Sequence, residues 1–353
     1  MRTQAEYREK PWVLGIDTSC YTTSLALADM SCRIVHQQRL LLPVPAGTKG
    51  LRQSDAFFLH LRHLPTMMEE LAQALPFPLA EGLGAVTVST SPCRRQDSYM
   101  PVFLAGHALG RSLAASCNIP LYKTTHQENH LMAACWSCKP TPPPGPFLAC
   151  HLSGGTTEII AVETYQLGND PQFSYRVLSG TLDIAAGQLI DRVGQLLGLP
   201  FPAGPHLEKL AGEMGEAPPT QPIPTYCRKG DVSFSGGEAW AKRALASGMA
   251  PAAIARAVEH YIGMSLAKAI QYHLAQGSPG SVPGYVLVMG GVAANQYLRQ
   301  MLPRRVARRL PCYFSDPAYS TDNAVGTALI GVSTCRQMAP GPALFCGAGE
   351  GEG

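Results

Sequence analysis

The chain has 353 residues, of which 46% are hydrophobic and 15% charged, so it can bury a sizeable core divided between two lobes. A net charge of +3 is too small to indicate nucleic-acid binding by itself, because that inference needs a clustered basic face. The N-terminal segment lacks the apolar stretch of a signal peptide, and no apolar run reaches the roughly 18 residues of a membrane span. We therefore expect a cytoplasmic protein with no membrane partner.

Strand and helix signals alternate through the first part of the chain. Short apolar runs at 13–16 and 24–28 flank a polar turn, and a third candidate strand lies near 33–36, which predicts a β-meander. Apolar residues with helical spacing then predict a helix over 54–75. The remaining predictions are a strand over 85–88 and helices over 102–117 and 125–134.

The Pro-rich segment 139–146 has the composition of a stiff linker. We place the boundary between an N-terminal lobe, 11–138, and a C-terminal lobe, 147–335, at this segment. The tail at 337–353 is rich in Gly, Ala and Pro and is predicted to be disordered.

The strand–turn–strand pattern then repeats at 147–152 and 158–162, followed by a third strand near 175–178 and a helix over 184–197. Aligning Ser19 with Ser153 also aligns the Thr-Thr pairs that follow each turn. This predicts an internal duplication and an α/β protein of two lobes with an interlobe cleft, although two short hairpins can also be similar by chance.

Eleven cysteines are scattered without regular spacing, which does not resemble a disulfide framework and fits a reducing compartment. The one close pair, Cys135 and Cys138, has no second CxxC with which to form a zinc site. We interpret these two residues as incidental thiols.

His126 and His130 lie four residues apart, which places two imidazoles on one helix face at a spacing suited to a metal ion. The residue after the first histidine is Gln127, and Glu128 lies about 100° further round the helix, so a zinc peptidase of the HExxH type is disfavoured. An isolated pair of this kind is more often formed by ordinary surface or core histidines.

Two glycine turns follow apolar strands. Gly290-Gly291 separates a strand at 285–289 from a helix at 296–302, and Ser153-Gly154-Gly155 follows the strand that ends at Leu152. Glycine lets backbone approach a ligand, and a helix N-terminus offers free N–H groups to an anion. Facing each other across a cleft, the two turns would resemble phosphate-binding loops.

Three further features permit both an ordinary and a functional interpretation. Asp183 and Asp191 bracket an amphipathic helix whose polar face is explained equally well by solvation. Thr321 or Asp322 is placed where an N-cap of the final helix is expected. The basic run Arg304–Arg309 suits phosphate contact, but such runs are more often solvated helix faces.

In this order the motifs resemble the threonylcarbamoyl transferase family, formerly described as sialoglycoprotein endopeptidases, over roughly 12–332. The motifs are His126-x-x-x-His130, Asp183-x-Ala-Ala-Gly187 with Asp191, Leu196-Leu-Gly-Leu199, Pro202-x-Gly204-Pro205, Phe234-Ser-Gly236, Gly290-Gly-Val-Ala-Ala-Asn295-x-x-Leu-Arg299 and Thr321-Asp322-Asn-Ala324. The resemblance implies a duplicated actin/Hsp70-like ATPase fold.

The resemblance also implies a site. His126, His130 and Asp322 would converge on one divalent metal, with Fe(II) preferred for a two-histidine, one-carboxylate set and Zn(II) as the alternative. The family's substrate loop and nucleotide contacts fall on His151, Leu152, Ser153, Gly154, Gly155, Asp191, Gly204 and Asn295.

The family reaction transfers the threonylcarbamoyl group of threonylcarbamoyl-adenylate to N6 of the tRNA adenosine beside the anticodon. Implied partners are threonylcarbamoyl-adenylate or ATP, tRNA, a smaller paralogous subunit and an ATPase subunit. The chain departs from the family at Tyr21 and Thr22, where two acids are usual, and at Thr156, where the family loop has histidine. These departures keep open a catalytically silent paralogue that binds metal and adenine nucleotide as a scaffold.

Overall fold

The computed structural model describes residues 11–19, 21–43, 51–94, 98–167, 170–276, 282–306 and 310–337. It divides into two compact units. The first contains the described residues within Met1–Pro144, Tyr165–Gln172 and Thr321–Gly353, and the second those within Gly145–Thr164 and Phe173–Ser320. Most of the predicted tail lies outside the described residues.

The first unit is built on a five-stranded sheet with the order β3-β2-β1-β4-β5. β1 (Trp12–Asp17), β2 (Thr22–Asp29) and β3 (Ile34–Leu41) form the predicted antiparallel meander. β4 (Leu83–Ser89) and β5 (Leu121–Thr124) extend the sheet in parallel with β1. β1, β2 and β4 are buried along almost their whole length, because the sheet is covered on both faces there.

Helices cover the two faces of this sheet. Leu14 and Ile16 of β1 pack in one apolar core with residues of α2 (Gln53–Ala74) and α4 (Phe103–Cys117). The alternate residue, Gly15, faces the opposite helix layer, as expected from the two-residue period of a strand. The short α3 (Leu79–Gly82) leads into β4, and α5 (His126–Ser137) follows β5.

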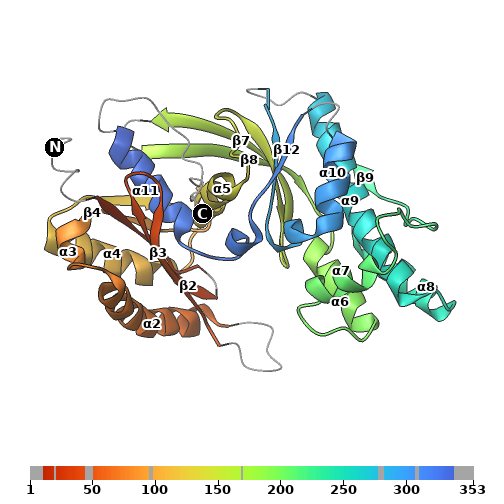
Figure 1. Ribbon diagram of the computed structural model, residues 1–353, viewed down its shortest axis with the longest axis horizontal. Coiled ribbons are helices and arrows are strands. Elements are labelled where there is room, and N and C mark those ends of the chain that lie inside the picture. Colours follow the sequence, from red (N-terminus) through yellow and green to blue (C-terminus); the bar gives the residue numbers. More distant parts are fainter. Residues whose placement is uncertain are drawn as a thin grey trace. The chain divides into compact units, whose positions relative to one another are not determined.

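The last helix, α11 (Val325–Gln337), belongs to the first unit, as can be followed in Figure 1. This corrects the predicted boundary, which assigned 147–335 to the C-terminal lobe and residue 337 to the tail. A Cβ added at Gly15 would lie 2.4 Å from the backbone N of Ala328, and one at Gly331 would lie 1.9 Å from Thr87 Oγ1. Small residues on both sides let α11 lie directly on the first sheet.

The second sheet repeats the first with the order β12-β11-β6-β7-β8. Its strands are β6 (Phe147–Leu152), β7 (Thr157–Leu167), β8 (Asp170–Gly180), β11 (Val286–Met289) and β12 (Cys312–Phe314). β6 pairs antiparallel with β7 and parallel with β11, which pairs parallel with β12. The strands of the two sheets correspond one to one, so the predicted duplication is confirmed.

Helices of the second unit share one apolar core with β6 and β11. They are α6 (Ala186–Leu196), α7 (Gly204–Gly212), α8 (Ser235–Ala246), α9 (Pro251–Gln276) and α10 (Gln296–Val306). The short elements β9 (Cys227–Arg228), β10 (Asp231–Val232), η1 (Gly291–Ala294) and η2 (Pro317–Tyr319) complete the described structure. Within the described residues, no helix is apolar over a length that would cross a membrane.

The cysteines differ in one respect from the expectation. Cys32 is disulfide-bonded, whereas the spacing of the cysteines along the chain did not indicate disulfide pairing. The other eight described cysteines are free thiols, and they include the buried Cys135 and Cys138.

Candidate functional site

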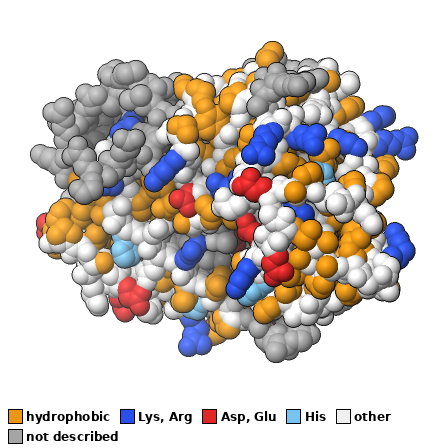
Figure 2. All heavy atoms as spheres, turned by 45° about the vertical axis from the view of Figure 1, so that its right-hand side comes forward, with side chains coloured by type: hydrophobic (Ala, Val, Ile, Leu, Met, Phe, Trp, Pro, Cys, Tyr) orange, Lys and Arg blue, Asp and Glu red, His pale blue; other side chains and the backbone are white. Residues whose placement is uncertain are grey.

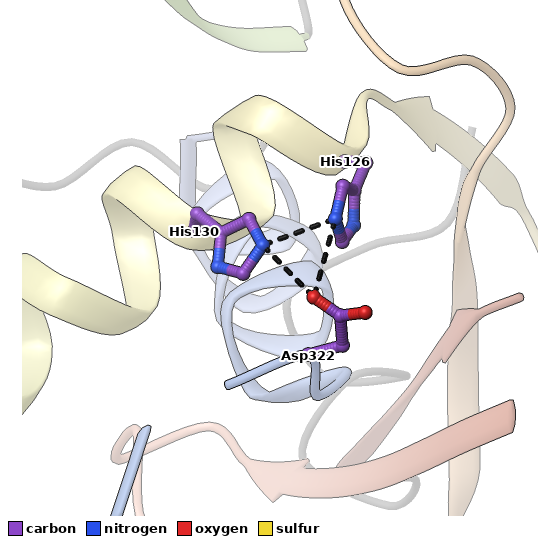
Figure 3. Close-up of side chains that lie close together, drawn as sticks. All are labelled: His126, His130 and Asp322. Carbon is purple, nitrogen blue, oxygen red and sulfur yellow. Dashed lines mark hydrogen bonds and ion pairs between the residues drawn. The ribbon is translucent and has the colours of Figure 1, made fainter. Parts of the chain in front are cut away.

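Three side chains from opposite ends of the chain meet in the first unit (Figure 3). His126 Nε2 lies 3.0 Å from His130 Nε2. Asp322 Oδ1 lies 3.6 Å from His126 Nε2 and 3.4 Å from His130 Nε2. All three ligand atoms lie within 4.8 Å of one another, and no other described residues form a comparable group of His, Cys, Asp or Glu side chains.

The spacing of these atoms suits one metal ion. Metal–ligand bonds of about 2.0–2.2 Å separate neighbouring ligand atoms by about 3.0 Å at right angles and about 3.4 Å at the tetrahedral angle. The observed separations of 3.0, 3.4 and 3.6 Å fall close to these values. The donor set of two imidazoles and one carboxylate leaves other coordination positions open, which suits Fe(II) and also permits Zn(II).

Local sequence explains how α5 presents its two histidines. Thr125 and Glu128 form a capping box at the start of the helix, which satisfies N–H groups that would otherwise lack partners. The backbone N–H of His126 also donates to the carbonyl of Ser91. The helix therefore begins at His126, and His130 follows about one turn later on the same face.

Asp322 lies in the turn before α11 and does not cap that helix. α11 begins at Val325, whose N–H donates to Asn323 Oδ1 at 2.9 Å. The alternative interpretation of Thr321 or Asp322 as an N-cap is therefore wrong, because the turn extends further along the chain than the sequence signal indicated. The carboxylate of Asp322 remains available to face the two imidazoles.

Asp17, at the end of β1, orients His126. Its Oδ2 lies 3.0 Å from His126 Nδ1, and the side chain is fully buried. Burial lowers the pKa of His126, but the charge of Asp17, their hydrogen bond and Asp322 outweigh it and raise this pKa well above its ordinary value. A carboxylate on Nδ1 leaves Nε2 directed at the other ligands, an arrangement common among metal-binding histidines.

Asp17 was not identified from the sequence as part of this site. The usable signal was positional: Asp17 ends β1, and His126 follows β5 directly after Thr124 and Thr125. Both strands run parallel with β4, so their carboxyl ends meet at the same sheet edge, where α/β proteins place their sites.

The predicted substrate loop lies at the corresponding edge of the second sheet. His151 and Leu152 end β6, and Gly154 and Gly155 are exposed with open space above their Cα atoms. Ser153 Oγ accepts the N–H groups of Gly155 and Thr156 at 3.3 and 3.0 Å. The loop is thus a tight turn whose glycine backbone is accessible.

The two glycine turns lie side by side in the second unit. Met289 pairs with His151 across adjacent parallel strands, and a Cβ at Gly290 would lie 2.2 Å from the Leu152 carbonyl oxygen. They therefore do not face each other across a cleft, which is the arrangement that a likeness to paired phosphate-binding loops would require. Gly290 has a φ of 95°, which only glycine adopts readily.

Asp191 and Gly204 lie close together on neighbouring helices. Asp191 of α6 accepts the backbone N–H of Ala203 at 2.9 Å, the residue that precedes Gly204 at the start of α7. Asp191 is partly exposed. Among the described residues, no group donates a hydrogen bond to its second carboxylate oxygen.

Asn295 is occupied by internal contacts. Its Nδ2 donates to Glu259 at 2.6 Å, and its Oδ1 accepts the N–H of Leu298 at 3.0 Å. The side chain is 8% exposed and caps α10. Its polar atoms therefore already have partners in the second unit.

The basic run is only partly described. Arg304 and Arg305 are exposed at the end of α10, whereas 307–309 lie outside the described residues. On the face drawn in Figure 2, Lys and Arg side chains lie among hydrophobic and uncharged ones. Contact of this run with RNA stays a prediction.

The fold places this chain in a known structural class. Two units with matching sheets form the duplicated actin/Hsp70-like ATPase fold, and solved structures share it. The activator of 2-hydroxyisocaproyl-CoA dehydratase from Clostridium difficile, with bound ADPNP, has a TM-score of 0.51 at 14% identity, covering 93% of this chain and 96% of that one. Full-length HypF, in its phosphate- and nucleotide-bound form, has a TM-score of 0.54 at 11% identity, covering 95% and 47%.

Sequence comparison identifies the family. The model of the tRNA N6-adenosine threonylcarbamoyltransferase family matches residues 58–329. The tRNA N6-adenosine threonylcarbamoyltransferase of one strain of Thermus thermophilus is 33% identical over 320 residues, which cover 90% of this chain and 91% of that protein. The protein of the same name from a second strain of this species is also 33% identical. This chain belongs to that family of transferases.

Proposed function

We propose that this chain performs metal-dependent transfer of the threonylcarbamoyl group from threonylcarbamoyl-adenylate to N6 of the tRNA adenosine beside the anticodon. The observation that carries this proposal is the convergence of His126, His130 and Asp322 in a chain that belongs to a transferase family. The N6 amine attacks the carbamoyl carbon, the bond to the phosphate oxygen breaks, and AMP leaves.

The first unit supplies the metal centre. His126, His130 and Asp322 would hold one divalent metal, Fe(II) or alternatively Zn(II), and the buried Asp17 fixes His126 so that its Nε2 faces His130 and Asp322. When bound, such a metal polarises the mixed anhydride of the donor. Metal binding requires a neutral imidazole, so His126 must give up the proton that its two carboxylate neighbours favour.

The second unit would hold the adenylate. The exposed turn at Gly154 and Gly155 would let an anionic oxygen approach the backbone closely, and donors fixed in advance stabilise charge that develops during transfer. The unengaged carboxylate oxygen of Asp191 suits a ribose hydroxyl, close to Gly204 at the start of α7. Asn295 would contribute to this pocket mainly by fixing the start of α10. The partners proposed with this activity are tRNA, a smaller paralogous subunit and an ATPase subunit, in the cytoplasm.

A scaffold function is the second candidate, because the first turn lacks two acids usual in the family. Tyr21 is 42% exposed, whereas Thr22 is 3% exposed and pairs with Leu41 in the sheet. An acid at position 21 would be solvated, but one at position 22 would be buried, at a large desolvation cost. Tyr21→Asp is therefore the substitution that tests acceptor function with the least disturbance.

The two candidates separate in a transfer assay with purified protein, its family partners, tRNA and threonylcarbamoyl-adenylate. We expect wild type to modify tRNA, Asp322→Ala to reduce transfer at least 100-fold, and the exposed-histidine control His206→Ala to match wild type. Nucleotide binding without transfer by wild type, and gain of transfer in Tyr21→Asp, would instead establish the scaffold.

A further inference from the structure

Asn129 lies on α5 between the two histidines and is fully buried. It contacts the turn that carries Asp322, while its own helix carries His126 and His130. The family motif assigns it no role, and its polarity alone would suggest a solvated helix position. Its complete burial calls for a different explanation, because a buried amide must find hydrogen-bond partners.

Both the amide nitrogen and the amide oxygen of Asn129 form hydrogen bonds. Its Nδ2 donates to Asp17 Oδ2 at 3.3 Å and to the backbone carbonyl of Asn323. Its Oδ1 accepts the backbone N–H of Thr327 at 2.8 Å. One side chain therefore connects the carboxylate that orients His126 with the turn that carries Asp322 and with the first turn of α11.

Backbone packing reinforces this connection. A Cβ added at Gly326 would lie 1.9 Å from the carbonyl oxygen of Asn129, so the start of α11 rests directly on the backbone of α5. Thr327 Oγ1 lies 3.1 Å from Ser89 Oγ at the end of β4. The Asn129 contacts thus belong to a buried polar network that fixes where the turn at 321–324 lies.

We propose that Asn129 is a positioning residue that sets the placement of Asp322 relative to the His126–His130 pair. The proposal rests on the metal centre proposed above. Asp322 is separated from the two histidines by almost 200 residues of chain, so its position is fixed only by tertiary contacts. Because metal affinity depends on ligands held in place before binding, loosening this turn weakens the site without removing a ligand.

The test is Co²⁺ titration of the metal-free, full-length protein, followed by the visible absorption of the bound ion. We expect Asn129→Ala to weaken Co²⁺ binding about 10- to 100-fold, the usual effect of losing a group that orients metal ligands, and to change the absorption spectrum. Ser137→Ala is the matched control, because Ser137 is buried on the same helix and its hydroxyl donates to the carbonyl of Ala134, one turn back on that helix. It should bind Co²⁺ as wild type does.

A double-mutant cycle separates positioning from general stability. If Asn129 acts through Asp322, adding Asn129→Ala to Asp322→Ala should change Co²⁺ affinity less than threefold, since the carboxylate that Asn129 positions is absent and only its 3.3 Å contact with Asp17 remains as a link to the ligands. An equal effect in both backgrounds would overturn the proposal. Asn129→Ser, which replaces the amide with a smaller hydroxyl that can still form a hydrogen bond, provides a second variant for the same titration if the alanine protein does not fold.

Failure of the metal centre itself gives a different result. In that case wild type would bind no Co²⁺, or would bind it only as tightly as the His126→Ala, His130→Ala variant. Wild-type affinity and spectrum in Asn129→Ala, with binding abolished in the histidine variant, would overturn only the positioning role.

Discussion

At the scale of single residues, the three candidate ligands make a direct prediction. His130→Ala and Asp322→Ala should each lower the metal content of purified protein from about one equivalent towards background, because two remaining ligands hold a divalent ion weakly. Elemental analysis after dialysis measures this. His206→Ala, an exposed histidine of the second unit, is the control, and stoichiometric metal in the Asp322 variant would place the site elsewhere.

Glu259 makes a second prediction at this scale. Burial, which outweighs the Asn295 hydrogen bond and the Arg256 charge, raises the pKa of Glu259 to about 7 from 4.5. Because the folded state holds this proton more tightly than the unfolded state, the contribution of Glu259 to stability is fully present below pH 4.5, is lost as the pH rises towards 7, and does not change further above that. The loss is on the order of 3 kcal/mol.

Glu259→Gln should remove this part of the pH dependence. Denaturant unfolding at pH 5 and pH 8 would then show a smaller decline for the variant than for wild type. The difference between the two proteins isolates Glu259 from the other titrating groups. Parallel stability profiles would show that the Arg256 ion pair, at 2.7 Å, keeps Glu259 ionised throughout.

At the scale of elements, the start of α6 is fixed by a glycine. A Cβ at Gly187 would lie 2.6 Å from Ser153 O and 2.7 Å from Gly154 Cα. Gly187→Ala should therefore displace the 153–155 loop and lower the free energy of unfolding by about 1–3 kcal/mol, the range for overpacking. It should also weaken ATP binding measured by calorimetry.

Gly212→Ala is the matched control for this helix region. Gly212 is exposed at the end of α7, and no atom lies within 4 Å of a Cβ placed there. Alanine at that position should leave stability unchanged or raise it by up to about 1 kcal/mol. If Gly187→Ala and Gly212→Ala had the same free energy of unfolding and the same ATP affinity, the close approach of the 153–155 loop to α6 would not be important for the position of that loop.

Elements with strong local signals were predictable from the sequence. The helix over 54–75 was found as α2 and the strand over 85–88 within β4, because the spacing of apolar residues within each segment is enough to indicate its secondary structure. α9 showed no such signal, since it is buried almost all round and has no polar face. The assignment of α11 failed because sequence order does not reveal which sheet a helix covers.

The residues of the candidate site also differ in whether the local sequence reveals them. His126 and His130 were found by their spacing within one helix, and Asp322 only through resemblance to a family. Asn129 showed no signal, because its partners Asn323 and Thr327 lie almost 200 residues away. Burial created by distant segments is not visible in the local pattern around a residue.

At the scale of the whole molecule, all three candidate ligands belong to the first unit. Bound metal should therefore stabilise that unit against unfolding more than it stabilises the second unit. At 100 times its Kd, a metal that binds only the folded state adds about 2.7 kcal/mol, which slows hydrogen exchange through unfolding about 100-fold. Removing it with a chelator should speed exchange in α5 and the start of α11.

Hydrogen-exchange mass spectrometry before and after chelation measures this effect. Peptides from α9, at the centre of the second unit's core, serve as the internal reference and should change little. Equal acceleration in α9 and α5 would indicate that metal stabilises the chain through contacts other than the three proposed ligands.

The placement of α11 has a consequence for how the protein is made. A ribosome releases β1 to β5 early, but the helix that lies on one side of their sheet emerges only after the entire second unit. Domains generally fold in the order of their synthesis. In this chain, however, synthesis of the first unit starts first, but that unit can complete its fold only after the second unit has been made. A chain that stops before Asp322 lacks α11 and would present the uncovered side of that sheet to proteases and chaperones, so incomplete products should be cleared.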